Sequence, residues 1–359
     1  MKRRIQASLC FILTHWLLSF FFFANTSIAQ QLPFGKGKAA AGKQYVLAFY
    51  NVENLFDIYN DPATQDDDFT PGGRLQWTKE RYQTKLKNIS TIISRIESYA
   101  PDILGLCEIE NKQVLEDLLN TDYLRFKDYG IAHYDSPDER GIDVALLYKR
   151  YAFKPLVTKA YPVNIAGDKT RDILLVSGIL GGKDTLHVLV CHFPSRSGGL
   201  EASAPKRMEA ARTVRLIIEA IRAGDPDANI VVMGDFNDEP TDASIWDGLK
   251  ARPHSFDLAS DELYNAMGVL DYLQEGSYCY RGNWQMLDQI ILSPPLVNPG
   301  NRLHYKIGSA RIFNPDYMRE KNGEYQGYPL RTYAGDKYLG GYSDHFPVYI
   351  ILEQVQTTP

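Results

Sequence analysis

Carboxylate, amide and imidazole side chains stand at the ends of apolar runs in six places along the chain. The clearest case is "NIVVMGDFNDEP", residues 229–240, in which a run suited to a buried strand leads directly into Asp235 and Asn237. Burying a carboxylate without a partner is costly, so a chain that ends core strands in this way must compensate the charge. One polar residue that closes a strand is usually a turn or a helix cap. The repetition favours one shared site.

Five further segments set a polar side chain against an apolar run: "AFYNVEN", "LGLCEIEN", "LVCHFPS", "MLDQIIL" and "GYSDHFPV". If each strand stays extended, side chains two residues apart share a face, so Asp235 and Asn237 lie together, as do Asn51 and Glu53. Carboxylate and amide oxygens without a cysteine and histidine cluster suit Mg²⁺, Mn²⁺ or Ca²⁺ better than zinc. The pattern therefore predicts a hard divalent cation, with Mg²⁺ or Mn²⁺ first and Ca²⁺ as an alternative.

Short apolar runs alternate with longer amphipathic stretches from residue 44 onward, which predicts an α/β fold without internal repeats. Helices are expected at 78–99, 111–119 and 205–223, the last with Pro205 at its start. No clear boundary divides this region, so one domain is predicted over residues 44–353, followed by a tail at 354–359. Strands are expected at 45–52, 102–109, 142–149, 172–180, 186–193, 229–236, 287–293 and 346–352.

The first 29 residues have the pattern of a cleaved signal peptide. Lys2, Arg3 and Arg4 precede an apolar run, and small residues fit a cleavage site near Ala29. An uncleaved anchor helix is the alternative, although the run is short for the ~30 Å of hydrocarbon that a spanning helix crosses. Residues 30–43 are small and polar and are predicted to be a linker. The chain is therefore expected to be secreted or periplasmic, without a membrane span after cleavage.

The composition, 44% hydrophobic and 23% charged over 359 residues, is ordinary for a globular protein. Loss of three basic residues with the signal peptide takes the formal charge from -5 to -8. A polyanionic substrate must then meet a local basic patch or a metal, because the overall field repels it. The remaining cysteines, Cys107, Cys191 and Cys279, are odd in number and imply no disulfide framework, so buried thiols are expected.

Seven segments together carry a family resemblance: "YNVEN", "CEIEN", "RGIDVALLY", "CHFPSR", "GDFND", "LDQIIL" and "SDHFPV". Over residues 45–352 they resemble, in the expected order, the endonuclease/exonuclease/phosphatase family, and "GDFN" with "SDH" are the most specific. "NVENLFD" and the signal peptide look most like its secreted bacterial branch of extracellular nucleases. The resemblance implies a deoxyribonuclease I-like four-layer α/β sandwich, with two mixed β-sheets packed face to face, helices outside, and an active site at one edge.

The resemblance also implies roles for individual residues. Glu108 would be the principal metal ligand, with Asn51 and Asp344 near the metal. A hard cation held by one or two carboxylates keeps positions open for a phosphate oxygen, which agrees with this assignment. Asp235 would orient or deprotonate the attacking water, and Asn237 would hold the phosphate.

Two histidines complete the implied site. His345 would lie over the scissile phosphorus, oriented by Asp288, because a carboxylate partner fixes the tautomer and favours the charged ring. His192 would act as an acid or as a donor to the developing charge, with Asp143 as its candidate partner. Three arginines beside these motifs are candidates for bidentate contacts to phosphate: Arg140, Arg196 and Arg207.

The predicted function is a metal-dependent phosphodiesterase, most simply a nuclease with DNA or RNA as its substrate and no stable protein partner. Relatives with the same machinery cleave sphingomyelin or dephosphorylate inositol phosphates, and these substrates stay open, as does a non-catalytic binding protein. A sphingomyelinase needs exposed apolar wedges, whereas the loops here hold Tyr and charge. Residues 301–342 contain seven Tyr and seven Lys or Arg against four acids. Such a segment either stacks on single-stranded nucleic acid or packs over a domain edge.

Overall fold

The computed structural model describes residues 42–355. The predicted signal peptide, residues 30–41 of the predicted linker and residues 356–359 lie outside this part of the chain. Within it, no helix combines the length and the apolar character that crossing a membrane requires. The first strand, β1, begins at Lys43, and the last, β18, ends at Gln354.

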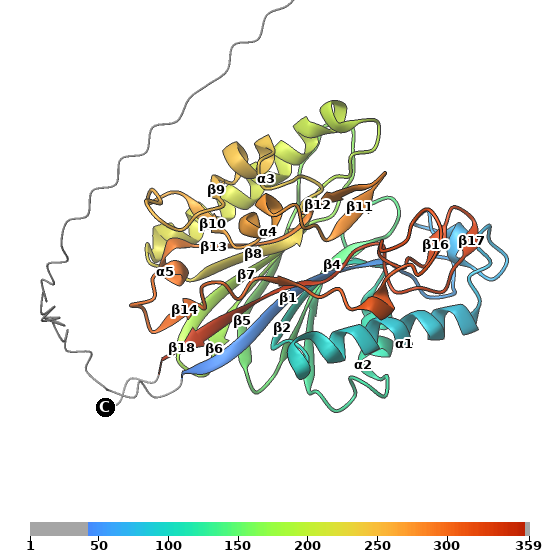
Figure 1. The fold of residues 1–359 in the computed structure, drawn as a ribbon, viewed down its shortest axis with the longest axis horizontal. Coiled ribbons are helices and arrows are strands. Elements are labelled where there is room, and N and C mark those ends of the chain that lie inside the picture. The colour runs from blue at the N-terminus through green and yellow to red at the C-terminus, as the bar shows by residue number, and fades with distance from the viewer. Residues whose placement is uncertain (1–41, 356–359) are drawn as a thin grey trace, which may run out of the picture. The chain divides into compact units, whose positions relative to one another are not determined.

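Two seven-stranded sheets form the centre of the fold (Figure 1). The first has the order β14-β18-β1-β2-β4-β3, with β15 paired to β18, and the second has the order β5-β6-β7-β8-β13-β10-β9. Both are mixed, since each contains parallel pairs among antiparallel neighbours. The first sheet consists of β14 (Leu303–Tyr305), β18 (Val348–Gln354), β1 (Lys43–Leu55), β2 (Ile103–Ile109), β4 (Asp143–Lys149), β3 (Tyr129–His133) and β15 (Arg311–Ile312).

The second sheet and two separate hairpins account for the remaining strands. The second sheet consists of β5 (Phe153–Tyr161), β6 (Ile173–Leu180), β7 (Asp184–His192), β8 (Ile230–Asp235), β13 (Asp288–Leu292), β10 (Leu263–Asn265) and β9 (Ala251–Arg252). The hairpins are β11 (Tyr278–Tyr280) with β12 (Asn283–Gln285), and β16 (Tyr333–Ala334) with β17 (Lys337–Tyr338).

Strand alternation divides the side chains of β1 between two cores. Tyr45, Leu47 and Phe49 are buried between the sheets, whereas Ala48 and Tyr50 pack toward the helices on the other side. Every second residue of an extended strand points to the same face, so each sheet contributes one face to the shared core. A polar residue that continues the inner face past the apolar run therefore lies at the edge of the sandwich.

Helices cover the outer face of each sheet. α1 (Lys79–Arg95) and α2 (Lys112–Leu119) share a core with the first sheet, and α3 (Leu200–Gly224) shares one with the second. Figure 1 shows α1 and α2 below the strands and α3 above them. Two shorter helices are α4 (Gly268–Tyr272) and α5 (Pro294–Val297). The predicted four-layer α/β sandwich is confirmed.

All eight predicted strands are present, and the main helical difference concerns the start of α3. This helix begins at Leu200, so Pro205 lies inside it and not at its start as predicted. Pro205 is the sixth residue of the helix, beyond the N-terminal N–H groups that lack a partner, so it removes one backbone hydrogen bond from the second turn. Strand β5 went unpredicted because most of its side chains are exposed and show no apolar alternation.

Candidate active site

Three polar side chains stand in one row across the second sheet. His192 ends β7, Asp235 ends β8 and Asp288 begins β13. The strand register pairs His192 with Asp235 and Asp235 with Asp288. All three continue the inner face of their strands, which Val190 and Met233 occupy two residues earlier. The register thus places an imidazole and two carboxylates side by side at the sandwich edge.

The first sheet contributes Asn51 and Glu108 to the same place. The Asn51 side-chain amide donates to Asp235 at 3.0 Å and to Glu108 at 3.3 Å. Its oxygen accepts the backbone N–H of Glu53 at 2.9 Å, so the amide orients two carboxylates across the seam between the sheets. Glu108 has a φ of 62° and lies where the β2–β4 register shifts. This bulge turns Glu108 away from the outer face that an extended strand would give it.

The predicted pairing of Asn51 with Glu53 on one strand face is corrected by the backbone. Glu53 and Asn54 have φ angles of 51° and 54°, so β1 does not stay extended beyond Asn51. Asn237 likewise has a φ of 49° and donates its backbone N–H to Asp235 at 2.9 Å. Non-glycine residues in this region cost about 1–3 kcal/mol each and gather where function requires them. Four of the twelve non-glycine residues with positive φ in residues 42–355 lie at this edge of the sandwich.

His345 lies just before β18 and bridges the two aspartates. Its Nδ1 is 2.6 Å from an oxygen of Asp288, and its Nε2 is 3.9 Å from an oxygen of Asp235. The Ser277 hydroxyl donates to the same Asp288 oxygen at 2.5 Å. Burial alone would lower the pKa of His345, but Asp288 and Asp235 raise it well above its ordinary value. The ring is therefore held as a cation with a fixed orientation.

Asp235 is a carboxylate whose proton affinity suits acid-base chemistry. Burial raises its pKa to about 7, with Asp288 adding to the shift and His345 opposing it. A buried carboxyl group that titrates near neutral pH can take a proton and release it again under physiological conditions. Asp288 and His345 next to it set this balance.

His192 faces the same carboxylates but has no partner on its other nitrogen. Its Nε2 lies 3.7 Å from Asp235 and 3.9 Å from Glu108, while Nδ1 is buried and makes no hydrogen bond within residues 42–355. Burial, followed by the charges of Arg171, Arg140 and His345, lowers the pKa of His192 well below its ordinary value. The ring is therefore neutral near pH 7.

The predicted pair of His192 with Asp143 is not formed. Instead, one oxygen of Asp143 lies 2.9 Å from Nε2 of His133, and the other accepts a hydrogen bond from the backbone N–H of Ser136 at 2.8 Å. His133 lies on β3, which pairs with β4, the strand that begins at Asp143. The sequence does not reveal this position, because β3 was not predicted. Asp143 thus fixes the turn that follows β3.

A second charge network, missed by the sequence reasoning, holds the chain that leads to His345. Asp344 lies 2.5 Å from Arg331. Glu53 accepts the backbone N–H of Thr332 at 2.6 Å and lies 3.4 Å from Arg331 and 3.9 Å from the buried Lys85. Burial and Asp344 raise the pKa of Glu53 to about 7, against the opposing effect of Lys85 and Arg331. The "NVEN" segment was the available signal, but its glutamate had no assigned role.

The donor set at this edge fits a hard divalent cation. Glu108, Asp235 and Asp288 gather with few balancing cations, and one buried oxygen of Asp288 has no partner in the part of the chain described. Two groups at this edge have ligand atoms within 4.8 Å of one another: Asp235 with Asp288 and His345, and Asp235 with His192 and Cys107. Oxygen donors of this kind suit Mg²⁺, Mn²⁺ or Ca²⁺. Glu108 and Asp344 have the chemistry of ligands, whereas the amide nitrogen of Asn51 orients the carboxylates.

The three candidate arginines have different surroundings. Arg140 keeps 47% of its side chain exposed, 3.5 Å from Asp138. Arg196 donates to the carbonyl of Asn237 at 2.7 Å and to Asp242 at 3.0 Å, so it holds the loop after β8. The Arg196 guanidinium is thus engaged within the protein, whereas the Arg140 guanidinium is open to solvent and could contact a phosphate.

Arg207 corrects the third prediction, because its guanidinium is buried in the protein. Its side chain is 0% exposed and lies 2.6 Å from Asp238, with a second bond to Ser203 at 2.7 Å. No part of the group is left for a substrate. The sequence placed Arg207 near the motifs but gave no sign of which helix face it occupies.

Replacing Arg207 by alanine is expected to lower the free energy of unfolding by about 3–5 kcal/mol, because it leaves Asp238 buried and unpaired. Urea denaturation measures this change. The matched control is Arg212→Ala on the same helix, whose side chain is 67% exposed and whose pair with Glu209 is a surface contact. An Arg207→Ala protein as stable as the Arg212→Ala control would contradict the structural role.

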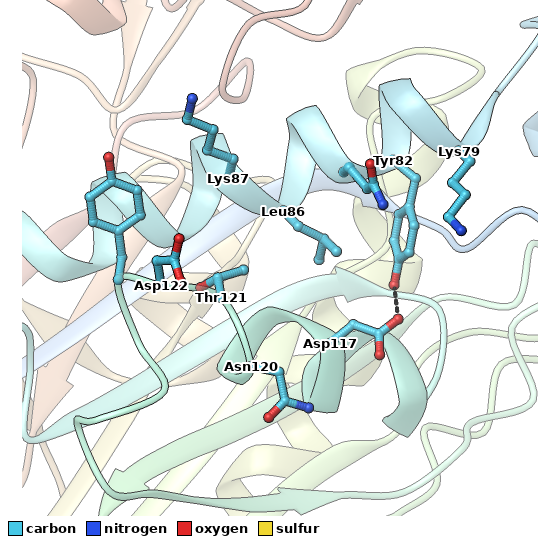
Figure 2. A pocket seen from close by; sticks show the side chains of 10 residues that line it. Lys79, Tyr82, Leu86, Lys87, Asp117, Asn120, Thr121 and Asp122 are labelled. Atoms are coloured by element: carbon cyan, nitrogen blue, oxygen red, sulfur yellow. Dashed lines mark hydrogen bonds between the residues drawn. The ribbon is translucent and has the colours of Figure 1, made fainter.

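The clefts beside the charged residues of the active site and the cleft away from them are lined by different residues. A cleft of 920 Å³ between α1 and α2 contains Tyr82, which donates to Asp117, but holds no histidine (Figure 2). Two others flank the charge cluster. One of 380 Å³ is lined in part by Glu53, Arg140 and Arg331, and one of 870 Å³ by Arg331 and Asp344. The flanking clefts are therefore the ones placed to receive a substrate.

The fold and the site together define a hydrolytic enzyme built on a four-layer α/β sandwich. The sequence matches the Endonuclease/Exonuclease/phosphatase family over residues 46–354, and the chain belongs to this family. It is a phosphoester-hydrolysing enzyme of a family that depends on divalent metals.

Solved structures agree with this fold. D. rerio TDP2 complexed with single strand DNA product is 13% identical with a TM-score of 0.54, covering 87% of this chain and all of that one. An endonuclease/exonuclease/phosphatase from Bacteroides vulgatus is 16% identical with a TM-score of 0.52, covering 87% and 99%. The human Nocturnin catalytic domain with bound sulfate is 18% identical with a TM-score of 0.50, covering 87% and 94%. No curated protein matches the sequence.

Proposed function

We propose that this chain is a secreted, Mg²⁺-dependent nuclease that hydrolyses phosphodiester bonds of DNA or RNA. The observation that carries the proposal is the His345–Asp288 pair at 2.6 Å, set against Asp235 at the edge where Glu108 also lies. The signal-peptide pattern of residues 1–29 supports secretion or export to the periplasm. Mn²⁺ and Ca²⁺ are the alternative cations.

Glu108 and Asp344 would hold the metal, and Asn51 would keep Glu108 and Asp235 in position through its amide. The bound cation supplies polarisation of a phosphate oxygen and stabilisation of the charge that develops on it. Because the carboxylates converge from both sheets, the cation would also reduce the repulsion among them. No membrane or protein partner is needed for this arrangement.

The chain's own residues divide the remaining work. Asp235, with its pKa near neutrality, would accept the proton of the attacking water. The cationic His345 would donate to a phosphate oxygen, and Asp288 would hold its ring in place. His192 is neutral, so of the two roles that the resemblance implied, acid or donor, it would donate one N–H to developing charge. Asn237 would contact the phosphate, as would the exposed Arg140.

The test is hydrolysis of supercoiled plasmid, of single-stranded RNA and of the small diester bis(p-nitrophenyl) phosphate, with Mg²⁺, Mn²⁺, Ca²⁺ or a chelator. We expect metal-dependent cleavage that falls by at least about 10²-fold in His345→Ala, since a positioned acid-base group contributes that much. His254→Ala is the matched control, because His254 contacts Phe256 and none of the site residues.

Two results would contradict the proposal. A folded wild-type protein that hydrolyses sphingomyelin or inositol phosphates but no nucleic acid would exclude a nuclease. A folded protein that binds no metal and hydrolyses no phosphoester would instead favour a non-catalytic binding protein on the same scaffold.

A further inference from the structure

The cleft of 870 Å³ beside the active site has an aromatic lining that the hydrolytic reaction does not use. It lies between the β11–β12 hairpin and residues 320–339, and it shares Arg331 and Asp344 with the charge network described above. Resting on the proposed nuclease function, we propose that this cleft binds an unpaired nucleobase of the nucleotide next to the scissile phosphate. The substrate strand would therefore be single-stranded where it is cut.

Two exposed tyrosines form the walls that such a base needs. Tyr280 is 52% exposed and Tyr325 is 56% exposed, although both belong to the cleft. The guanidinium of Arg281 lies 5.1 Å from the centre of the Tyr280 ring. Open aromatic faces with an arginine beside them are the usual platform for stacking of single-stranded bases, because every base has a π-face.

A series of ring contacts connects Tyr325 to Phe346, the residue that follows the catalytic histidine. Tyr325 contacts Tyr328 edge to face at 5.6 Å, Tyr328 lies 6.2 Å from Trp284, and Trp284 stacks on Phe346 at 5.9 Å. Phe346 is fully buried and follows His345 in the chain. Since the last ring is part of the core, the outer rings are held in place before a ligand arrives, which reduces the entropy lost on binding.

The distance from the reacting centre identifies which base the cleft would take. The Tyr278 ring lies 4.8 Å from the His345 ring, and residues 278 and 345 form an isolated β-bridge. Tyr280 follows two residues later on the same strand face, about 7 Å further along. A base on Tyr280 thus belongs to a nucleotide adjacent to the phosphate at His345.

The charges of the cleft favour a base over the other ligands of this enzyme class. Glu320 and Glu324 line it together with Arg281. Carboxylates repel the phosphates of an inositol polyphosphate but accept hydrogen bonds from the amino groups of a base. Tyrosines with carboxylates could also surround the quaternary ammonium of phosphocholine, but Arg281 beside Tyr280 places a like charge in its way.

The experiment compares Tyr280→Ala and Tyr325→Ala with wild type on three substrates. These are a short single-stranded oligonucleotide, the same oligonucleotide with abasic sugars around the cleaved position, and bis(p-nitrophenyl) phosphate. We expect each variant to lose roughly tenfold in kcat/KM on the intact oligonucleotide, in line with the loss of one stacked base. On the small diester we expect each variant to have the kcat/KM of the wild type. On the abasic strand, which has no base to stack, we expect the variants and the wild type to have equal kcat/KM. Tyr325→Trp should restore cleavage.

Tyr272→Ala is the matched control, because Tyr272 is 85% exposed at the end of α4 and is not part of the cleft. Oligonucleotide cleavage at the wild-type rate by both tyrosine variants would overturn the inference while leaving the nuclease intact. Inhibition by phosphocholine that is lost in the tyrosine variants would overturn it in favour of a lipid headgroup. Absence of hydrolysis of both the oligonucleotide and the small diester by the wild-type protein would instead overturn the proposed function.

Discussion

Replacing Glu108 by glutamine is expected to abolish metal binding and to lower kcat/KM by about 10³-fold or more, without loss of stability. The side chain keeps its size, but its one amide oxygen can accept only one of the two hydrogen bonds that Glu108 accepts from Asn51 and Asn54, which costs about 1–3 kcal/mol. The hard cation loses the charge of a principal ligand, worth several kcal/mol of transition-state stabilisation. Removing one carboxylate also relieves repulsion with Asp235. The relieved repulsion offsets the lost hydrogen bond, so the site loses its chemistry while the free energy of unfolding changes little.

Calorimetric titration with Mg²⁺ and thermal unfolding with and without the metal would measure both effects. A ligand at 100 times its Kd stabilises the folded state by about 2.7 kcal/mol, so the wild-type protein should melt higher in Mg²⁺ and the variant should not. Glu116→Gln, which changes an exposed carboxylate paired with Lys112 on α2, is the control. A Glu108→Gln protein that still gains stability from Mg²⁺ would show that the principal ligand lies elsewhere.

Replacing Asp288 by asparagine is expected to lower kcat by about 10²–10⁴-fold, the range for loss of a positioned acid-base function. Asp288 raises the pKa of His345 and orients its ring through Nδ1. Asparagine keeps the shape and removes the charge. His345 then becomes neutral at a lower pH, and its N–H no longer has a fixed direction.

The pH dependence gives this prediction its sign. The folded-state pKa of His345 is raised, so its ion pair stabilises the fold fully below the ordinary imidazole pKa of ~6.5, and that stability is lost as pH rises through the folded value. Activity that requires the cation should fall over the same alkaline range. In Asp288→Asn this alkaline limb should move to lower pH.

Kinetics from pH 5 to 10 would measure the limb, with Asp227→Asn, a change at an exposed carboxylate, as the control. An alkaline limb at the same pH in wild type and Asp288→Asn would show that the cationic His345 is not the active form.

The row of His192, Asp235 and Asp288 could be anticipated from the sequence, because strand alternation alone carries a polar side chain along the inner face of an apolar run. The sequence also indicated eight of the strands and the main helices. These features depend on short-range periodicity, which the residues show directly. The family resemblance supplied the two mixed sheets, packed face to face with helices outside, which periodicity does not contain.

Other parts of the site depend on backbone geometry and long-range contacts that no short pattern reveals. The side chain of Glu108 points to the boundary between the two sheets only because of a bulge in β2. Glu53 points away from this boundary because β1 is no longer extended there. Asp143 was assigned to His192, but strand β3 brings His133 to it first. Arg207 was a candidate for a phosphate contact, although its position on α3 turns it toward Asp238.

The tyrosine-rich segment at residues 301–342 divides between the two readings that its composition allowed. Tyr333 is buried in the core beside α1, and Tyr317, Tyr338 and Tyr342 pack against that core. Tyr325 and Tyr328 line the open cleft. Composition cannot separate these groups, because the same residue type covers a core in one place and presents an open face in another.

The hydrogen bond from Asn51 to Asp235 joins a residue of the first sheet to a residue of the second, at 3.0 Å. Neither sheet holds the active site alone, so hydrolysis depends on the specific docking of one sheet against the other. In a molten globule, secondary structure persists while such fixed side-chain packing is lost. A chain in that state would keep its far-ultraviolet circular dichroism and lose its activity. Hydrolysis is therefore a measure of native packing between the two sheets. A molten globule contains every catalytic side chain but does not assemble them into an active site.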